Sequence, residues 1–381
     1  MQFVTHGAVC ALVMPTRNRC ARLQATLTRL AATPGPAVEV IVVDNASTDG
    51  TTAMLAEQFP EVRAIELTEN TGATGRNMGA QAAQAPFLFM LDDDSGPYPG
   101  TLEQAIDALR DPKLGVVACQ VVLPDGSREE GGSRSAFIGC GAVLRRQDLL
   151  SFGGYHPEYT CYVEEYDVSY RFLALGLAVR YLDECLVWHE PTARDSYDFM
   201  VEKLLSNNGY LAAKFCPTEE AVRFVSWITY RYSVFAQQKG AANGFRRGME
   251  QLPEKILRGL ADRFPLAESV MDLVMPERET APTFAALKRQ GAQRIAFLRA
   301  GKELPGMIQA ARNAGLQVEA VLEFPDGLMA KIERLFDSPV MPAADVSPTF
   351  DAVVIGGTSP GFVYNTLARA QRLGIANVVA P

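Results

Sequence analysis

The sequence has no long apolar run, and no stretch approaches the roughly 18 consecutive apolar residues that a membrane-spanning helix requires. No basic segment precedes the first apolar run, so residues 8–14 are interpreted as a buried strand and not as part of a signal peptide. Basic residues are outnumbered by acidic ones, and the net charge of −8 argues against a general nucleic-acid binder. We expect neither a transmembrane segment nor a nucleic-acid partner.

Paired cysteines are absent as well. The seven cysteines are scattered and odd in number, and no two have the CxxC spacing of a zinc or redox site. This pattern argues against a disulfide framework and indicates reduced thiols. Histidine is scarce, with only three in the chain. We therefore expect a soluble, cytoplasmic protein.

What the sequence does contain is a regular alternation of strand and helix signals. Its 381 residues are too many for one ordinary core and suit two domains. The expected strands of the first part are 8–14, 38–43, 62–67 and 87–91, and the expected helices are 19–32, 50–58 and 75–84. This rhythm predicts an α/β fold with an open, mostly parallel sheet that binds ligands at the carboxyl ends of its strands.

The later part of the chain changes character twice. Residues 198–275 look helical, and the stretch 275–282, which contains Pro and charged residues, is typical of a linker. Beyond it the strand–helix rhythm restarts, which predicts a second, smaller Rossmann-like α/β unit. We expect domains at 1–216 and 281–381, joined by a helical extension and linker at 217–280.

Three adjacent carboxylates, Asp92, Asp93 and Asp94, follow the apolar run 86–91. At the end of a buried strand they would repel one another unless a cation neutralised them. Carboxylate oxygens suit Mg²⁺ or Mn²⁺, and such ions usually also hold the phosphates of a substrate. A solvated acidic turn is the alternative, because residues 95–100 are typical of a loop.

Polar residues stand at the ends of all four expected strands of the first part. The segments are Pro15–Asn18, Asp44–Gly50, Asn70–Gly79 and Asp92–Asp94. One such loop could be a capped turn, but four at one sheet edge are hard to explain as turn chemistry. Together they offer carboxylates and amides to a base or ribose, an arginine to a phosphate, and a metal site.

Further motifs extend this set in a fixed order. The pieces are 13–18, 40–51, 70–79, 89–94, 138–145, 162–171 and 187–189. Over about residues 8–216 the set resembles an inverting family 2 glycosyltransferase of the GT-A fold, most closely its rhamnosyltransferase-like branch. The resemblance implies transfer of a sugar from a nucleoside-diphosphate sugar to a hydroxyl acceptor (a glycan, a lipid-linked acceptor or a small molecule), with Mn²⁺ or Mg²⁺ as cofactor.

The resemblance also assigns the donor and metal sites residue by residue. The residues implied to contact the donor are Pro15, Thr16, Arg17, Asp44, Asn45, Arg76, Asn77, Asp92 and Asp93, and the implied metal ligands are Asp94, Asp92 and His189. Asp44 would contact the nucleobase, which favours a UDP or dTDP donor and leaves GDP open. Arg17 could instead be a surface cation, Asn77 a packing residue of its helix, and His189 an ordinary loop histidine.

An inverting transfer needs a base that takes the proton of the acceptor hydroxyl. In the family's pattern this is the second acid of the pair Glu164-Glu165, so Glu165 is expected to be catalytic and Glu164 is the alternative. Many family members have Asp where this chain has Glu165. An acidic first turn of a helix, which Asp167 could provide by itself, is the structural interpretation.

The second unit lacks a dinucleotide-binding fingerprint. In its first strand–helix turn Arg299 stands where G-x-G-x-x-G would begin, so only Gly301 and Gly306 remain. We expect a docking, dimerisation or nucleotide-sensing module, and a homo-oligomer stays open. The basic and aromatic residues within 198–275 could contact the inner face of an anionic membrane, but an amphipathic face packed on the first domain is more common.

Two other functions compete with sugar transfer. A nucleotidyltransferase of similar fold usually has a Gly-rich phosphate loop after its first strand, where this chain has Pro15–Asn18. A non-catalytic regulator that binds sugar nucleotides would not require a base such as Glu165. The sequence therefore favours the glycosyltransferase, without fixing its sugar, its acceptor or the linkage.

Overall fold

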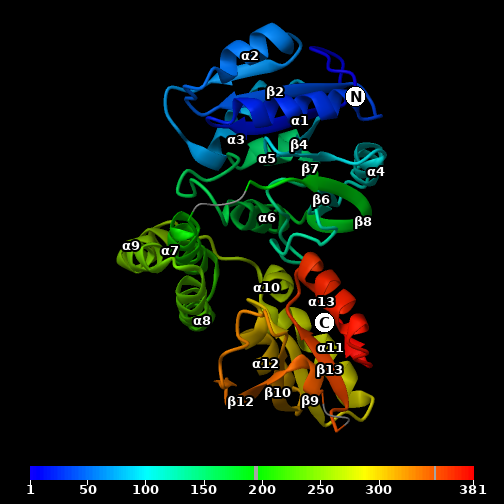
Figure 1. Ribbon diagram of the computed structural model, residues 1–381, viewed down its shortest axis with the longest axis vertical. Helices are drawn as coiled ribbons and strands as arrows, with labels where there is room; N and C mark the ends of the chain where they lie inside the picture. Colours follow the sequence, from blue (N-terminus) through cyan, green and yellow to red (C-terminus); the bar gives the residue numbers. More distant parts are fainter. Residues whose placement is uncertain (193–195, 347–348) are drawn as a thin grey trace. The chain divides into compact units, whose positions relative to one another are not determined.

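The computed structural model describes residues 1–192, 196–346 and 349–381. The chain divides into two compact units, Met1–Ala193 and Arg194–Pro381 (Figure 1). The expected α/β class is confirmed, because each unit contains a mostly parallel or mixed sheet together with helices. The boundaries expected at 216 and 280 stay predictions. Within the described residues, no helix is both long and apolar enough to cross a membrane.

The first unit is built on an eight-stranded sheet with the order β3-β2-β1-β4-β7-β6-β8-β5. Its strands are β1 (Cys10–Thr16), β2 (Val38–Asp44), β3 (Arg63–Glu66), β4 (Phe87–Met90), β5 (Ser95–Pro97), β6 (Leu114–Val122), β7 (Ala142–Arg145) and β8 (Ala178–His189). Strands β1 to β4 run parallel, whereas β7 is antiparallel to both β4 and β6. Every residue of β2 is buried, as is typical of a strand covered on both faces.

The helices of this unit follow the sequence pattern closely. They are α1 (Cys20–Ala32), α2 (Thr51–Gln58), α3 (Gly75–Ala82), α4 (Thr101–Ala108), α5 (Arg146–Ser151) and α6 (Glu164–Ala174), with a 3-10 turn at Gly72–Thr74. Leu23, Leu27 and Leu30 recur at helical spacing on α1 and are fully buried. Helix α3 lies so close to β1 that a Cβ on Gly79 would come within 2.5 Å of Cγ1 of Val13.

Strands β1, β2 and β4 end at one edge of the sheet. Thr16, the last residue of β1, is the register partner of Asp44, the last residue of β2. Val13 pairs with Met90 of β4, so the acidic residues that follow β4 are at the same edge. Open α/β sheets bind ligands at this edge. The predicted polar segments are thus brought together as the parallel sheet requires.

The second unit combines a helical part with a six-stranded sheet of order β11-β12-β10-β9-β13-β14. Its helices are α7 (Asp198–Phe215), α8 (Thr218–Lys239), α9 (Ala242–Ala261), α10 (Glu268–Val274), α11 (Pro276–Arg289), α12 (Leu304–Asn313) and α13 (Pro360–Arg372), with a 3-10 turn at Ala343–Asp345. Its strands are β9 (Arg294–Ala300), β10 (Gln317–Glu323), β11 (Arg334–Leu335), β12 (Ser338–Pro342), β13 (Ala352–Gly356) and β14 (Val378–Val379).

The prediction of a linker at 275–282 is wrong, because helix α11 begins at Pro276. Pro276 occupies the first turn, where its missing N–H leaves no intrahelical bond unmade and its fixed φ suits the helix. Glu277 and Glu279 lie in the same turn and interact favourably with the helix dipole. The combination of Pro and charge therefore marks a helix start and not a loop.

Part of the basic and aromatic helical face packs inside the second unit. Trp227 of α8 is buried, and its ring centroid lies 5.1 Å from that of Phe336. Nη1 of Arg231 donates to the carbonyl oxygen of Ala300, at the end of β9, over 2.6 Å. These side chains pack against the unit's own strands and loops, so they do not form the membrane-facing surface considered from the sequence.

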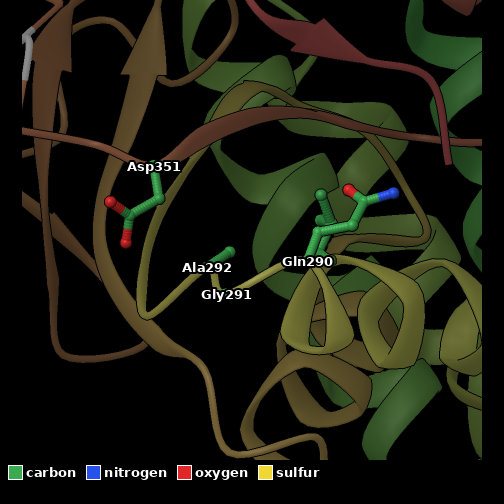
Figure 2. Close-up of a pocket in the computed structure, with 5 residues that line it drawn as sticks. Gln290, Gly291, Ala292 and Asp351 are labelled. Carbon is green, nitrogen blue, oxygen red and sulfur yellow. The ribbon is translucent and has the colours of Figure 1, made fainter.

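A pocket of the second unit lies at the end of its sheet where strands begin, which is not the end that open α/β folds use for ligands. Figure 2 shows this pocket of about 310 Å³, lined by Leu287, Gln290, Gly291, Ala292 and Asp351. It lies just before β9 and β13 begin, whereas such folds bind ligands where strands end. The carboxylate of Asp351 accepts the backbone N–H groups of Gln293 and Arg294, which explains it as a loop-forming residue.

Candidate active site

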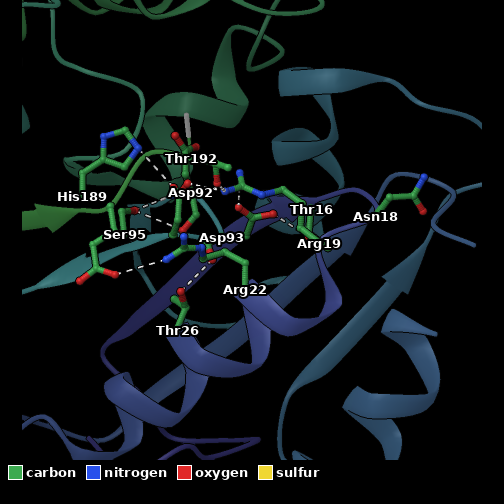
Figure 3. A network of polar contacts seen from close by, with 12 residues as sticks. Thr16, Asn18, Arg19, Arg22, Thr26, Asp92, Asp93, Ser95, His189 and Thr192 are labelled. Atoms are coloured by element: carbon green, nitrogen blue, oxygen red, sulfur yellow. Dashed lines mark hydrogen bonds and ion pairs between the residues drawn. The ribbon is translucent and has the colours of Figure 1, made fainter. Parts of the chain in front are cut away.

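Asp93, the middle carboxylate of the row, is held by residues of β1, of α1 and of the loop between them (Figure 3). Nη1 of Arg19 lies 2.8 Å from its Oδ1, and the hydroxyl of Thr16 donates to its Oδ2 over 2.7 Å. Its carbonyl oxygen accepts the hydroxyl of Thr26 at 2.8 Å. Burial raises the pKa of Asp93 to about 6, against the opposing charge of Arg19. Asp93 therefore ties the end of β1 to the start of α1.

Asp94 connects Arg19 to His189. Its Oδ2 lies 2.6 Å from Nη2 of Arg19, and its Oδ1 lies 3.2 Å from Nε2 of His189. Burial by itself would raise the pKa of Asp94, but His189 and Arg19 together hold it below its ordinary value. Asp94 is therefore an anion whose side chain is only 4% exposed.

His189 ends strand β8, and its two ring nitrogens face different carboxylates. Nδ1 lies 2.6 Å from Oε2 of Glu129, an acid that the sequence did not single out. Burial would lower the pKa of His189, but Asp94, Cys140 and Glu129 raise it. Glu129 holds the Nδ1–H group, as a carboxylate does in most metal-binding histidines, and binding of a cation at Nε2 would release the proton from that nitrogen.

A possible metal centre follows from these positions. An oxygen of Asp92, the sulfur of Cys140 and a ring nitrogen of His189 all lie within 4.8 Å of one another. The sequence grouped Asp92, Asp94 and His189. The structure places His189 beside both acids and adds Cys140, which the sequence did not suggest.

The fit to a divalent cation rests on Asp94. Its Oδ1 is buried and accepts no hydrogen bond from the described residues, although Nε2 of His189 is 3.2 Å away. Two ligand atoms about 2.1 Å from one ion and at right angles to each other are about 3 Å apart. The oxygen and the nitrogen are thus spaced like neighbouring ligands of one ion. These residues fit Mn²⁺ or Mg²⁺.

Arg76 and Asn77, from the first turn of α3, are engaged inside the unit. Arg76 forms an ion pair with Asp92, and its side chain is 5% exposed. Burial lowers the pKa of Arg76, but the charge of Asp92 raises it above its ordinary value, so the guanidinium stays charged. The amide of Asn77 donates to and accepts from the backbone of Tyr155, each over 2.8 Å. It thereby fastens the loop before α6 to α3.

The acidic pair expected to supply the base begins helix α6. The two preceding residues, Tyr162 and Val163, have φ of 65° and 76°, and such backbones cost about 1 kcal/mol or more each. Burial raises the pKa of Glu164 to about 8, and the charges of Glu165 and Asp92 add to the shift. Glu165 itself is half-buried. The charges of Arg76 and Asp92 both act on Glu164, which is consistent with one site for the pair and the carboxylate row.

The predicted base-binding residues lie at the ends of β1 and β2 and in the loops that follow these strands. Oδ1 of Asp44 accepts the N–H of Ser47 at 3.0 Å, and Oδ1 of Asn45 accepts both the N–H and the hydroxyl of Thr71 at 3.0 Å. Pro15 is half-buried and Arg17 is exposed at the same edge. These loops are thus prearranged by hydrogen bonds among themselves, with Arg17 open to solvent.

Three residues of the site, Arg19, Glu129 and Cys140, were missed by sequence reasoning. Arg19 is two positions beyond Arg17 and could have been included with the same loop. Glu129 lies in a Gly-rich segment between β6 and β7 that matches no motif, and Cys140 lies within the motif 138–145, which indicated no metal ligand. Only the folded chain shows that both reach His189.

Comparison with known proteins gives a family match for most of this unit. Residues 11–164 match the family model described as Glycosyl transferase family 2. The O-antigen biosynthesis protein RfbC of Myxococcus xanthus is 24% identical over 223 residues, 48% of this chain and 17% of that protein. The succinoglycan biosynthesis protein ExoO of Rhizobium meliloti (strain 1021) is 41% identical over 78 residues, 20% of this chain and 22% of that protein. The chain thus covers about a fifth of the length of these curated relatives.

Solved structures with a similar arrangement come from two organisms. The mannosyltransferase PcManGT from Pyrobaculum calidifontis, in complex with GDP-Man and Mn²⁺, has a TM-score of 0.44 at 18% identity and covers 81% of this chain and 88% of its own. Residues 1–349 of TarS from S. aureus, in complex with UDP-GlcNAc, have a TM-score of 0.47 at 16% identity, with 81% and 92% covered.

Proposed function

We propose, from the glycosyl transferase family 2 domain that residues 11–164 form, that this chain is a metal-dependent inverting glycosyltransferase. It moves a sugar from a nucleoside-diphosphate sugar to a hydroxyl acceptor. The observation that carries the proposal is the contact between His189 and the carboxylate row, with Asp92 of that row acting on the charge of Glu164. A site for binding alone would not need an acidic pair, of which Glu164 is buried and Glu165 half-buried, near its metal ligands.

The donor diphosphate is held through the carboxylate edge. Asp92, Asp94 and His189 would hold Mn²⁺ or Mg²⁺, which when bound neutralises the charge that develops on the departing diphosphate. Arg76 orients Asp92 through their ion pair, and Arg19 balances Asp94. The donor-binding site is completed by residues that contact the donor or position the loops around it: Pro15, Thr16, Arg17, Asp44, Asn45, Asn77 and Asp93. We favour UDP or dTDP as the nucleotide, because a pyrimidine N3–H can donate to Asp44.

Glu165 is the proposed base. Glu164 is buried and its raised pKa keeps a proton on it near neutral pH, so it is a poor proton acceptor there. Glu165 is half-buried and follows directly. Its carboxylate takes the acceptor's hydroxyl proton while that oxygen bonds to the anomeric carbon and the bond from this carbon to the diphosphate oxygen breaks. One displacement from the opposite face inverts the anomeric centre.

The test compares matched variants against a panel of sugar nucleotides. Glu165→Gln and Asp94→Ala are expected to lower the transfer rate at least about 100-fold, in the range typical of a lost base or charge-stabilising group. Glu103→Gln, an exposed acid in the first turn of α4, is the control and should leave the rate unchanged. Undiminished transfer in both site variants would contradict the proposal. Metal-dependent binding of a nucleoside diphosphate without any transfer would favour the regulator instead.

A further inference from the structure

The sulfur of Cys140 lies inside the candidate metal centre. Cys140 is 2% exposed and stands two residues before β7, between Gly139 and Gly141. Its Sγ, an oxygen of Asp92 and a ring nitrogen of His189 lie within 4.8 Å of one another. A buried cysteine is often only a small apolar side chain. Here it faces a carboxylate and an imidazole, which an apolar role does not explain.

Two independent contacts indicate that His189 is arranged as a ligand. Its Nδ1 is held by Glu129 at 2.6 Å, which leaves Nε2 to face Asp94. Nε2 lies 3.2 Å from Oδ1 of Asp94, and this buried oxygen accepts no hydrogen bond from the described residues. A cation between Oδ1 of Asp94 and Nε2 of His189 would bind this carboxylate oxygen. The sulfur of Cys140 lies within 4.8 Å of a ring nitrogen of the same histidine.

We propose that Cys140 is a further ligand of this centre, which makes the site prefer thiophilic divalent ions such as Zn²⁺, Co²⁺ and Cd²⁺ over Mg²⁺. This inference rests on the proposed metal role of Asp92 and His189. Carboxylate and imidazole alone suit Mg²⁺, Mn²⁺ and Zn²⁺, whereas a thiolate strongly favours the softer ions. The thiol proton leaves to solvent when the sulfur binds the ion.

The consequence is a site whose metal preference depends on one residue. Replacement of sulfur by oxygen in Cys140→Ser keeps the size of the side chain and hardens the ligand set. Zn²⁺ affinity is expected to fall about 10-fold or more, because a ligand is lost to the soft ion. Affinity for Mg²⁺ should change much less, so the ratio of the two affinities is the informative quantity.

The first experiment adds Co²⁺ or Cd²⁺ to the reduced, full-length protein and records the ultraviolet charge-transfer absorption of a metal–thiolate bond. The band is expected in the wild type and in Cys10→Ser, a buried cysteine of β1, and absent in Cys140→Ser. Glu129→Gln should weaken binding while keeping the band. Persistence of the full band in Cys140→Ser would overturn the inference.

A second measurement needs no variant at Cys140. The ¹¹³Cd NMR shift of the wild-type complex reports directly whether sulfur is a ligand, so misfolding of Cys140→Ser leaves the question answerable. A shift typical of oxygen and nitrogen ligands alone would refute the role of Cys140.

The outcomes separate this inference from the proposed function. If Asp94→Ala abolishes sugar transfer while Cys140→Ser leaves the spectrum and the Zn²⁺ affinity unchanged, the transferase stands and the thiolate ligand falls. If the band depends on Cys140 but Asp94→Ala and Glu165→Gln transfer sugar at the normal rate, the metal site stands and the proposed mechanism falls.

Discussion

At the scale of single residues, the site is a balance of buried charges. Asp93 and Asp94 are nearly enclosed, and Arg19 neutralises them in part through contacts of 2.8 and 2.6 Å. Asp92 has its own partner in Arg76. Burying a carboxylate without such partners would cost several kcal/mol. The chain therefore stabilises a row of acids in its folded state while leaving Asp92, whose side chain is 38% exposed, open to a ligand.

The acid pair gives a prediction for the dependence of stability on pH. Glu164 has a pKa of about 8 in the folded protein against an ordinary value of 4.5. The folded state thus binds more protons than the unfolded state between these values, so stability falls as pH rises through this window. We expect the wild type to lose stability relative to Glu164→Gln between about pH 4.5 and 8, by up to about 1.4 kcal/mol per pH unit.

Urea unfolding of the two proteins at several pH values checks this prediction. Glu103→Gln is the control, because it removes an exposed acid and should leave the wild-type pH profile intact. Parallel profiles for the wild type and Glu164→Gln would show that Glu164 is ionised in the folded protein across the whole range.

The sequence could identify residues whose partners are fixed by strand order, but not those that meet through loops. Asp92 and Asp94 follow a buried strand, and His189 ends another. A mostly parallel sheet therefore predicts that all three residues lie at the same edge of the sheet. Glu129 and Cys140 come from an irregular segment, and no periodicity reports where such a segment runs. The direct ligand roles of these residues stay predictions.

At the scale of secondary structure, apolar periodicity predicted helices and strands reliably, whereas the positions of Pro and Gly did not predict loops reliably. The helix expected at 19–32 is α1 (Cys20–Ala32), and the one expected at 75–84 is α3 (Gly75–Ala82). Pro276 was interpreted as a linker residue but begins α11. Strand β7 (Ala142–Arg145) was not singled out, because four residues after a Gly-rich bend give too short a pattern.

Close packing of α3 on β1 gives a prediction at this scale. Gly79→Ala places a Cβ only 2.5 Å from Cγ1 of Val13, so the helix or the strand must shift. We expect a loss of about 1–3 kcal/mol in the free energy of unfolding. Met78→Ala, on the exposed side of the same helix, should change it by less than about 0.5 kcal/mol.

Chemical denaturation of both variants measures this difference. The shift should also reach Arg76, on the preceding turn of α3, and so weaken metal binding through Asp92. Equal stability of Gly79→Ala and Met78→Ala would mean that α3 is less tightly packed on β1 than the structure shows.

At the scale of the whole molecule, each unit has an apolar core of its own. The core of the first includes Leu12, Phe89 and Val143, and that of the second includes Phe284 and Phe297. We therefore predict two transitions in calorimetric unfolding of the full chain. In our proposal a nucleoside diphosphate with its metal binds only the first unit. It should therefore raise the temperature of only one transition, with a gain of about 2.7 kcal/mol in the free energy of unfolding of that unit at 100 times its Kd.

Gly79→Ala identifies that transition, because its strain lies within the first unit. The transition whose temperature falls in this variant should be the one whose temperature rises when the nucleotide binds. A nucleotide that raised the other transition would place its site among the loops at the ends of β9 and β13. The Arg299 backbone, with a φ of +67° at the end of β9, is the feature that would then need a ligand-binding explanation.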